Sequence, residues 1–246
     1  MKKPEGKLQE LVSRLQEACG NNLVSVVLFG SAAREDFHEE FSDVNLLVVL
    51  QQLKPDSFAA ISQVLRWWSH DEKLRPPLIM TVEELRESAD VFAIELLDIK
   101  SSHKTLFGQD VAAGIDVPMN LHRIEVEHEL RTTILRLRHH LLLSPDHEEE
   151  LRAVLAKSIT SVLTLFRHAL IALGENPPHA RPQLLQRAGE VFGFDVGPLQ
   201  SILELRNVGL HPKNLRELYY AYMSAIQRVA HELDVRVPKR NLRSSS

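Results

Sequence analysis

The residues best suited to chemistry lie in one short stretch, VVLFGSAAREDFHEEFSDVNLLVVL, which spans residues 26–50. An apolar run typical of a buried strand ends at Gly30-Ser31. If Ser31 begins a helix, its hydroxyl and the backbone N–H groups around it form an anion site. Glycine at position 30 would let a phosphate approach the backbone closely. The alternative is that Gly30-Ser31 forms a simple turn.

Two polar residues open the second apolar run, which begins Asp43-Val44-Asn45. Side chains along a strand alternate between its faces, so Asp43 and Asn45 share one face while Val44 points into the core. Oxygen ligands of this kind suit a hard cation such as magnesium. Two such ions roughly 3.5–4 Å apart can hold the attacking and leaving oxygens of a phosphoryl displacement. The alternative is a solvated pair of polar residues.

Apolar spacing predicts the elements that must position these residues. Helices are expected at 5–19 and 56–70, and strands at 23–29, 44–50 and 78–81. Thr81 and Glu84 have the spacing of a capping box, so a helix is expected after the third strand. This alternation predicts an α/β layer.

The second half of the chain has no strand signal. Its amphipathic patterns predict helices at 120–143, 147–174, 181–193 and 213–234. We therefore expect two domains and a flexible tail, at residues 1–112, 119–236 and 237–246 respectively.

The string Gly30-Ser31, Ala33-Arg34 and Ser42-Asp43-Val44-Asn45 resembles the DNA polymerase β-like nucleotidyltransferase superfamily, in particular its small bacterial branch that includes aminoglycoside nucleotidyltransferases. The strict motif covers only residues 26–50. The resemblance implies an α/β (α+β) nucleotidyltransferase fold with a small mixed sheet, followed by a C-terminal all-α helical bundle. It also implies transfer of a nucleoside monophosphate from a magnesium-bound nucleoside triphosphate to an acceptor hydroxyl.

Some site residues of that family carry over and one does not. The resemblance implies that Gly30 and Ser31 hold the triphosphate and that Asp43 binds Mg²⁺. Arg34 matches a common position of the family, where it would meet a phosphate, with a surface ion pair to Glu35 or Asp36 as the alternative. Asn45 replaces the second metal-binding acid, so its oxygen remains but one negative charge is lost. Because outer-shell losses alone cost about 10–100-fold, we expect at least that loss of metal affinity or activity.

The third acid of the family, which activates the acceptor hydroxyl, is also missing. Our alignment places that position at Ile79, within the apolar strand 78–81. Glu95 and Asp98 are the nearest substitutes, because the sequence AIELLDIK embeds them among apolar residues, which solvated acids usually avoid. The alternative for these two acids is a structural ion pair with Lys100 or Arg75.

A second constellation lies in the helical half, where Arg206-Asn207 is followed by His211. This resembles the Arg-Asn-x-x-x-His signature of the HEPN superfamily, whose members often act as ribonucleases. The histidine would serve as acid or base and the arginine would stabilise a phosphate transition state. The alternative is a charge at a helix end followed by a loop histidine.

Composition limits the function classes further. The chain of 246 residues has a net charge of −4, and its single cysteine excludes an internal disulfide. Residues 1–117 carry 12 Lys and Arg against 19 Asp and Glu, and neither half is basic enough to favour nucleic acid. The longest apolar runs are far shorter than the ~20 residues of a membrane helix. We therefore expect a cytoplasmic protein.

Two functional hypotheses follow, with a third in the helical half. The first is a bacterial nucleotidyltransferase that uses a magnesium-bound nucleotide and is catalytically impaired by Asn45 and by the apolar residue at Ile79. The second is a non-catalytic relative, a pseudoenzyme that binds a nucleotide or a protein partner. The third is a HEPN-like ribonuclease at Arg206 and His211.

Overall fold

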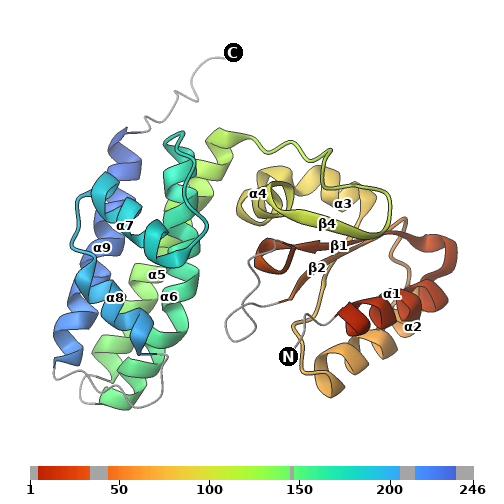
Figure 1. Ribbon diagram of the computed structural model, residues 1–246, viewed down its shortest axis with the longest axis horizontal. Coiled ribbons are helices and arrows are strands. Elements are labelled where there is room, and N and C mark those ends of the chain that lie inside the picture. Colours follow the sequence, from red (N-terminus) through yellow and green to blue (C-terminus); the bar gives the residue numbers. More distant parts are fainter. Residues whose placement is uncertain (1–4, 34–43, 145–146, 206–213, 237–246) are drawn as a thin grey trace. The chain divides into compact units, whose positions relative to one another are not determined.

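The computed structural model describes residues 5–33, 44–144, 147–205 and 214–236 (Figure 1). The chain divides into two compact units, Met1–Pro118 and Met119–Ser246. Each unit has its own core and is described by itself.

The N-terminal unit is built on a four-stranded mixed sheet with the order β3-β2-β1-β4. Its strands are β1 (Leu23–Phe29), β2 (Asn45–Leu50), β3 (Leu78–Thr81) and β4 (His103–Gly108). Strand β1 runs antiparallel to both β2 and β4, whereas β2 and β3 are parallel. The end of β1 therefore lies beside the start of β2, and Phe29 pairs with Asn45.

Helices cover both faces of this sheet (Figure 1). They are α1 (Glu5–Cys19), α2 (Pro55–Arg66), α3 (Val82–Glu87) and α4 (Ala93–Ser101), with the shorter turns η1 (Gly20–Asn22), η2 (Gly30–Ala33), η3 (Trp67–Asp71) and η4 (Ser88–Asp90). Helices α1 and α2 pack on the face that carries Val26 and Val48. Helices α3 and α4 pack on the face that carries Val27 and Leu47. The central strands are buried on both sides, so they read as continuous apolar runs.

Several sequence predictions for this unit are confirmed. The helix at 5–19 and the strands at 23–29 and 78–81 have the expected bounds. The capping box is also present, because Thr81 Oγ1 accepts from Glu84 N at 3.1 Å and Thr81 N donates to Glu84 Oε2 at 2.7 Å. Strand β4 and helix α4 were not predicted. Strand β4 is an edge strand with no fully buried residue, so it lacks the alternation that identifies a strand.

The C-terminal unit is helical throughout its described residues. Its helices are α5 (Met119–Leu143), α6 (Glu148–Ala172), α7 (Arg181–Phe192), α8 (Gly197–Glu204) and α9 (Leu215–Arg236). Helices α6 and α9 each contact the other four, so both are central to the bundle. The predicted fold class, a small mixed sheet with an all-α C-terminal region, is confirmed.

The central helix α6 also has the composition of a membrane span. Within the described part of the chain it is the one helix long and apolar enough to cross a membrane, and 50% of its most apolar window is buried inside the protein. Burial of this kind is typical of the core helix of a bundle.

Two tyrosines of α9 are fully buried in the bundle. The Tyr219 hydroxyl donates to the Leu137 carbonyl oxygen at 2.9 Å, and the Tyr222 and Ser158 hydroxyls lie 3.1 Å apart. Burial raises the pKa of Tyr219 to about 12. Burial also raises the pKa of Tyr222, and the hydrogen bond with Ser158 opposes that shift. Both side chains are therefore neutral hydrogen-bonding groups at physiological pH.

These tyrosines predict how the stability of the bundle depends on alkaline pH. The folded-state pKa of Tyr219 is raised above its ordinary value of 10.0, so its contribution is fully present below about pH 10 and is lost as the pH rises through about 12. We expect the free energy of unfolding, measured by urea denaturation, to fall across that interval. The Tyr219→Phe variant should show a shallower fall. Ionisation of Tyr219 near pH 10 in the folded protein, seen as a 295 nm absorbance difference from that variant, would contradict this expectation.

Candidate active site

Gly30 forms the turn at the end of β1. Its φ of +75° lies in the left-handed region, which glycine adopts without the steric cost that a Cβ atom imposes. The Gly30 N–H donates to the Ser102 carbonyl oxygen at 2.9 Å, and the Ser102 hydroxyl donates to the Gly30 carbonyl oxygen at 3.3 Å. The turn is therefore fixed to the residue that follows α4. Because this N–H already has a partner, a phosphate near the turn would have to use other donors.

Asn45, the residue in place of the second acid, lies next to this turn. It is the first residue of β2 and is partly buried. Its Oδ1 atom accepts a hydrogen bond from Arg75 Nη1 at 3.3 Å. Its Nδ2 atom is 3.3 Å from the point where a side chain at Gly30 would place its Cβ. The amide thus lies between the Gly30 turn and a guanidinium group.

The register of β3 places Ile79 on the face opposite that of Asn45. Leu47 pairs with Leu78, whereas Ile79 pairs with Val48. Asn45 shares its face with Leu47, because the two are separated by two positions along β2. The β3 residues on that face are therefore Leu78 and Met80, and Leu78 is the one nearer the start of the strand. Ile79 packs against the opposite core, with α1 and α2. All three residues are apolar, so β3 offers no acid on either face.

The two candidate substitutes for the third acid have different environments. Glu95 is exposed, although its neighbours in the sequence are apolar. It lies on the solvent side of α4, whose buried residues are Ala93, Ile94, Leu96 and Ile99. Asp98 is partly buried and lies one turn before Ser102, whose N–H donates to the Asp98 carbonyl oxygen at 3.2 Å. Asp98 is therefore closer in the sequence than Glu95 to Ser102, the residue that holds the Gly30 turn.

Other predicted site residues lie outside the described part of the chain. They are Arg34, Asp43, Arg206, His211 and the side chain of Ser31, whose backbone belongs to η2. Among the described residues, which exclude Asp43, no group of three or more His, Cys, Asp or Glu side chains is arranged to hold a metal ion. The oxygen of Asn45 faces the cation of Arg75. A positive charge beside this oxygen repels a magnesium ion, so the Asn45 position with Arg75 beside it does not fit one.

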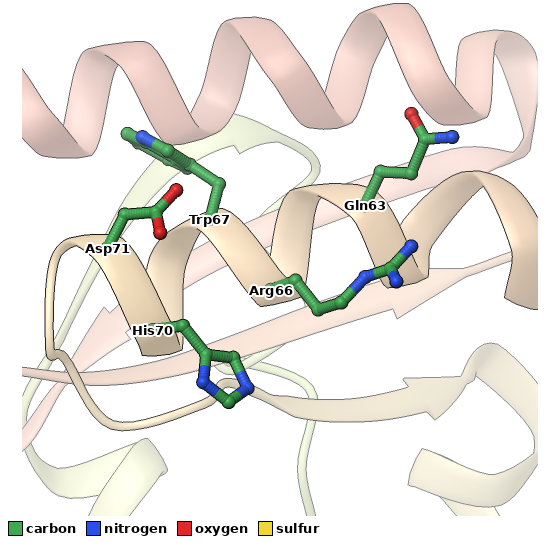
Figure 2. A pocket seen from close by; sticks show the side chains of 5 residues that line it. All are labelled: Gln63, Arg66, Trp67, His70 and Asp71. Atoms are coloured by element: carbon green, nitrogen blue, oxygen red, sulfur yellow. The ribbon is translucent and has the colours of Figure 1, made fainter.

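A shallow pocket of about 490 Å³ lies elsewhere on the N-terminal unit. Figure 2 shows its lining residues, which are Gln63, Arg66, Trp67, His70 and Asp71. All of them come from α2 and η3, on the side of the sheet that α1 covers. Trp67 extends toward α1, where the Arg14 guanidinium lies 4.2 Å from its ring centroid. The pocket contains none of the predicted site residues.

Arg75 and Ser102 belong to the site but were not predicted to do so. Arg75 stands just before Pro76-Pro77 and β3, and the starts of parallel neighbouring strands lie at the same edge of a sheet. A basic residue just before the strand parallel to β2 was therefore a usable signal. Ser102 had no comparable signal, because its contact with Gly30 depends on β4, which the sequence did not predict.

Comparison with known proteins agrees with this architecture. Residues 7–103 match the family model described as "Nucleotidyltransferase domain". The chain is similar in structure to a spectinomycin adenyltransferase, AAD(9), from Enterococcus faecialis, which was solved with ATP and spectinomycin. That similarity has a TM-score of 0.60 at 18% sequence identity and covers 91% of this chain and 98% of that one. No curated protein sequence matches the chain significantly.

These findings relate the chain to one family. Most of the N-terminal unit matches the nucleotidyltransferase domain model, and the matched region includes β1, β2 and β3 together with the Gly30 turn. The chain as a whole has the fold of the spectinomycin adenyltransferase. The predicted resemblance to the polymerase β-like nucleotidyltransferases is therefore confirmed.

The Gly30 turn predicts a localised defect in a Gly30→Ala variant. Alanine would have to adopt a φ of +75° and would place its Cβ 3.3 Å from Asn45 Nδ2. We expect a loss of about 1–2 kcal/mol in the free energy of unfolding, together with displacement of the Asn45 amide.

Gly174→Ala is the matched control, because Gly174 has a φ of +82° and no other atom lies within 4 Å of the point where its Cβ would stand. It should lose similar stability without any effect at Asn45. Nuclear magnetic resonance of the Asn45 side-chain amide would distinguish the two variants. An unchanged Asn45 signal in Gly30→Ala would contradict the assigned contact.

Proposed function

We propose that this protein binds a nucleoside triphosphate at the edge of the sheet formed by Gly30, Ser31 and Asn45. The observation that carries this proposal is the left-handed Gly30 turn placed directly beside Asn45, within a nucleotidyltransferase domain. The turn leaves the strand end without a bulky side chain, so a phosphate can approach the backbone there. Magnesium bound to the nucleotide would neutralise part of its phosphate charge.

The proposed reaction is transfer of a nucleoside monophosphate to an acceptor hydroxyl, with release of pyrophosphate. A solved protein of the same fold was crystallised with ATP and spectinomycin, which supports a nucleotide together with a hydroxyl-bearing acceptor. A cytoplasmic location, where nucleoside triphosphates are available, belongs to this proposal.

We propose that this transfer is slow, because the site has lost acidic groups. Asn45 contributes no negative charge, and the neighbouring strand position on its face is Leu78. The first change weakens the group that would hold the metal. The second leaves no acid on β3 to take the proton from the acceptor hydroxyl. Asp98 is the remaining candidate for the base, since it lies on α4, the helix that ends next to Ser102, which holds the Gly30 turn.

A second candidate function is non-catalytic binding of a nucleotide or a partner protein. The same two residues, Asn45 and Leu78, favour this function, since neither carries the carboxylate that catalysis would use and both fit the fold. A HEPN-like ribonuclease at Arg206 and His211 receives no support from the described residues, because both positions lie outside them.

Calorimetric titration of the purified protein with each of the four nucleoside triphosphates tests the proposal. We expect one of them to bind in the presence of magnesium, and the Gly30→Ala variant to bind it more weakly than Gly174→Ala does. Absence of binding to all four nucleotides would overturn the proposed function and leave the non-catalytic alternative with a protein partner.

Slow transfer is distinguished from no transfer by measuring pyrophosphate release in the presence of hydroxyl-bearing acceptors, including aminocyclitols and aminoglycosides. If Asp98 is the base, Asp98→Asn should lower the rate by about 10²–10⁴-fold, the usual contribution of general base catalysis. Glu95→Gln is the matched control on the same helix and should retain the wild-type rate, because Glu95 is exposed. Equal rates in the two variants would exclude Asp98 as the base.

A further inference from the structure

Arg75 is held at the candidate site by its backbone. The Trp68 indole Nε1–H donates to the Arg75 carbonyl oxygen at 2.8 Å, and Trp68 is fully buried. Pro76 follows directly, and a residue before proline is restricted to extended conformations. The Arg75 side chain itself is exposed. A fixed backbone with an exposed cationic side chain is suited to binding an anion that arrives from solvent.

The chain reaches Arg75 through an irregular segment. Helix α2 continues into η3, a π-helical turn at Trp67–Asp71, and Lys73 then adopts a φ of +55°. Lys73 is the one non-glycine residue with positive φ among those described. A conformation of this kind costs about 1 kcal/mol or more and often accompanies a functional site. The segment ends with the Leu74 N–H donating to the Trp68 carbonyl oxygen at 3.2 Å, immediately before Arg75.

The guanidinium group of Arg75 lies where a metal ion would meet residue 45. Its Nη1 atom donates to Asn45 Oδ1 at 3.3 Å, and within the described residues Arg75 forms no ion pair with a carboxylate. A carboxylate with a divalent cation carries one net positive charge, and a neutral amide with a guanidinium also carries one. The Asn45–Arg75 pair thus reproduces the net charge of an acid with its metal.

We infer that Arg75 is a phosphate-binding residue that takes the place of one metal ion in this site. This inference rests on the proposed function, since it assigns a role within the same nucleotide site. Asn45 accepts one N–H of the guanidinium and leaves its other donors for the phosphate oxygens of a nucleoside triphosphate. Arginine is suited to that contact because its planar donors match phosphate geometry in a bidentate manner.

Nucleotide affinity in Arg75 variants tests the inference. Arg75→Ala should weaken binding of the nucleoside triphosphate by about 10- to 100-fold, the usual size of a lost hydrogen bond to a charged group. Arg75→Lys should give an intermediate affinity, because it keeps the charge and loses the planar fork. Arg66→Ala is the matched control. This substitution removes the same charge from the exposed surface of α2, which packs on the sheet face opposite that of Asn45. The Arg66→Ala variant should therefore bind the nucleotide as the wild type does.

The outcomes separate the two proposals. Weakened binding in Arg75→Ala, with Arg66→Ala unaffected, supports the inference. Equal affinity of wild type and Arg75→Ala overturns the inference and leaves the proposed nucleotide site intact. Wild-type protein that binds none of the four nucleotides overturns both. Thermal unfolding of each variant checks that the affinity changes are not due to loss of the fold.

Metal binding without nucleotide gives an independent test. In Asn45→Asp the new carboxylate would pair with the Arg75 guanidinium, so this change alone should raise Mn²⁺ affinity little. The double variant Asn45→Asp/Arg75→Ala frees the carboxylate and should bind Mn²⁺ at least about 10-fold more tightly than Asn45→Asp, as measured by electron paramagnetic resonance. Equal Mn²⁺ affinity in the two variants would show that Arg75 does not occupy the metal position.

Discussion

The antiparallel pairing of β1 with β2 is the constraint on which the candidate site depends. It brings the end of one strand beside the start of the other, so that Phe29 pairs with Asn45 although a long connection separates them in the chain. The remaining parts attach to this pair. Ser102, the residue just before β4, holds the Gly30 turn, and the parallel strand β3 brings Arg75 beside Asn45. Each buried strand also contributes side chains to both cores, which fixes the register of the pair.

The elements that bury apolar surface on a regular period could be predicted from the sequence. Strand β1 and helix α1 are of this kind, and the capping residues Thr81 and Glu84 marked the start of α3 correctly. Strand β4 was missed because edge strands bury little and lack a clear pattern. That omission had a direct consequence at the site, since the partner of Gly30 comes from the residue just before β4.

Single positions within correctly predicted elements were harder to place. The strand at 78–81 was expected. Which of its side chains lie on the same face as Asn45 depends on the pairing register, which the sequence does not contain. A shift of one residue moves every side chain to the other face, and the register places Leu78 rather than Ile79 on the face of Asn45. Glu95 shows the same limitation on a helix, because apolar neighbours in sequence do not determine which side of α4 faces solvent.

The hydrogen bond between Trp68 and Arg75 gives the protein an intrinsic optical reporter. The chain contains only two tryptophans, which are adjacent, and Trp68 is the fully buried one. Its indole N–H is bonded to the backbone of the residue that reaches Asn45. Indole emission depends on the hydrogen bonding and polarity around the ring, so the fluorescence of Trp68 follows the conformation of this segment. A rearrangement of the Arg75 backbone that breaks this hydrogen bond should therefore change the tryptophan emission, without an attached dye.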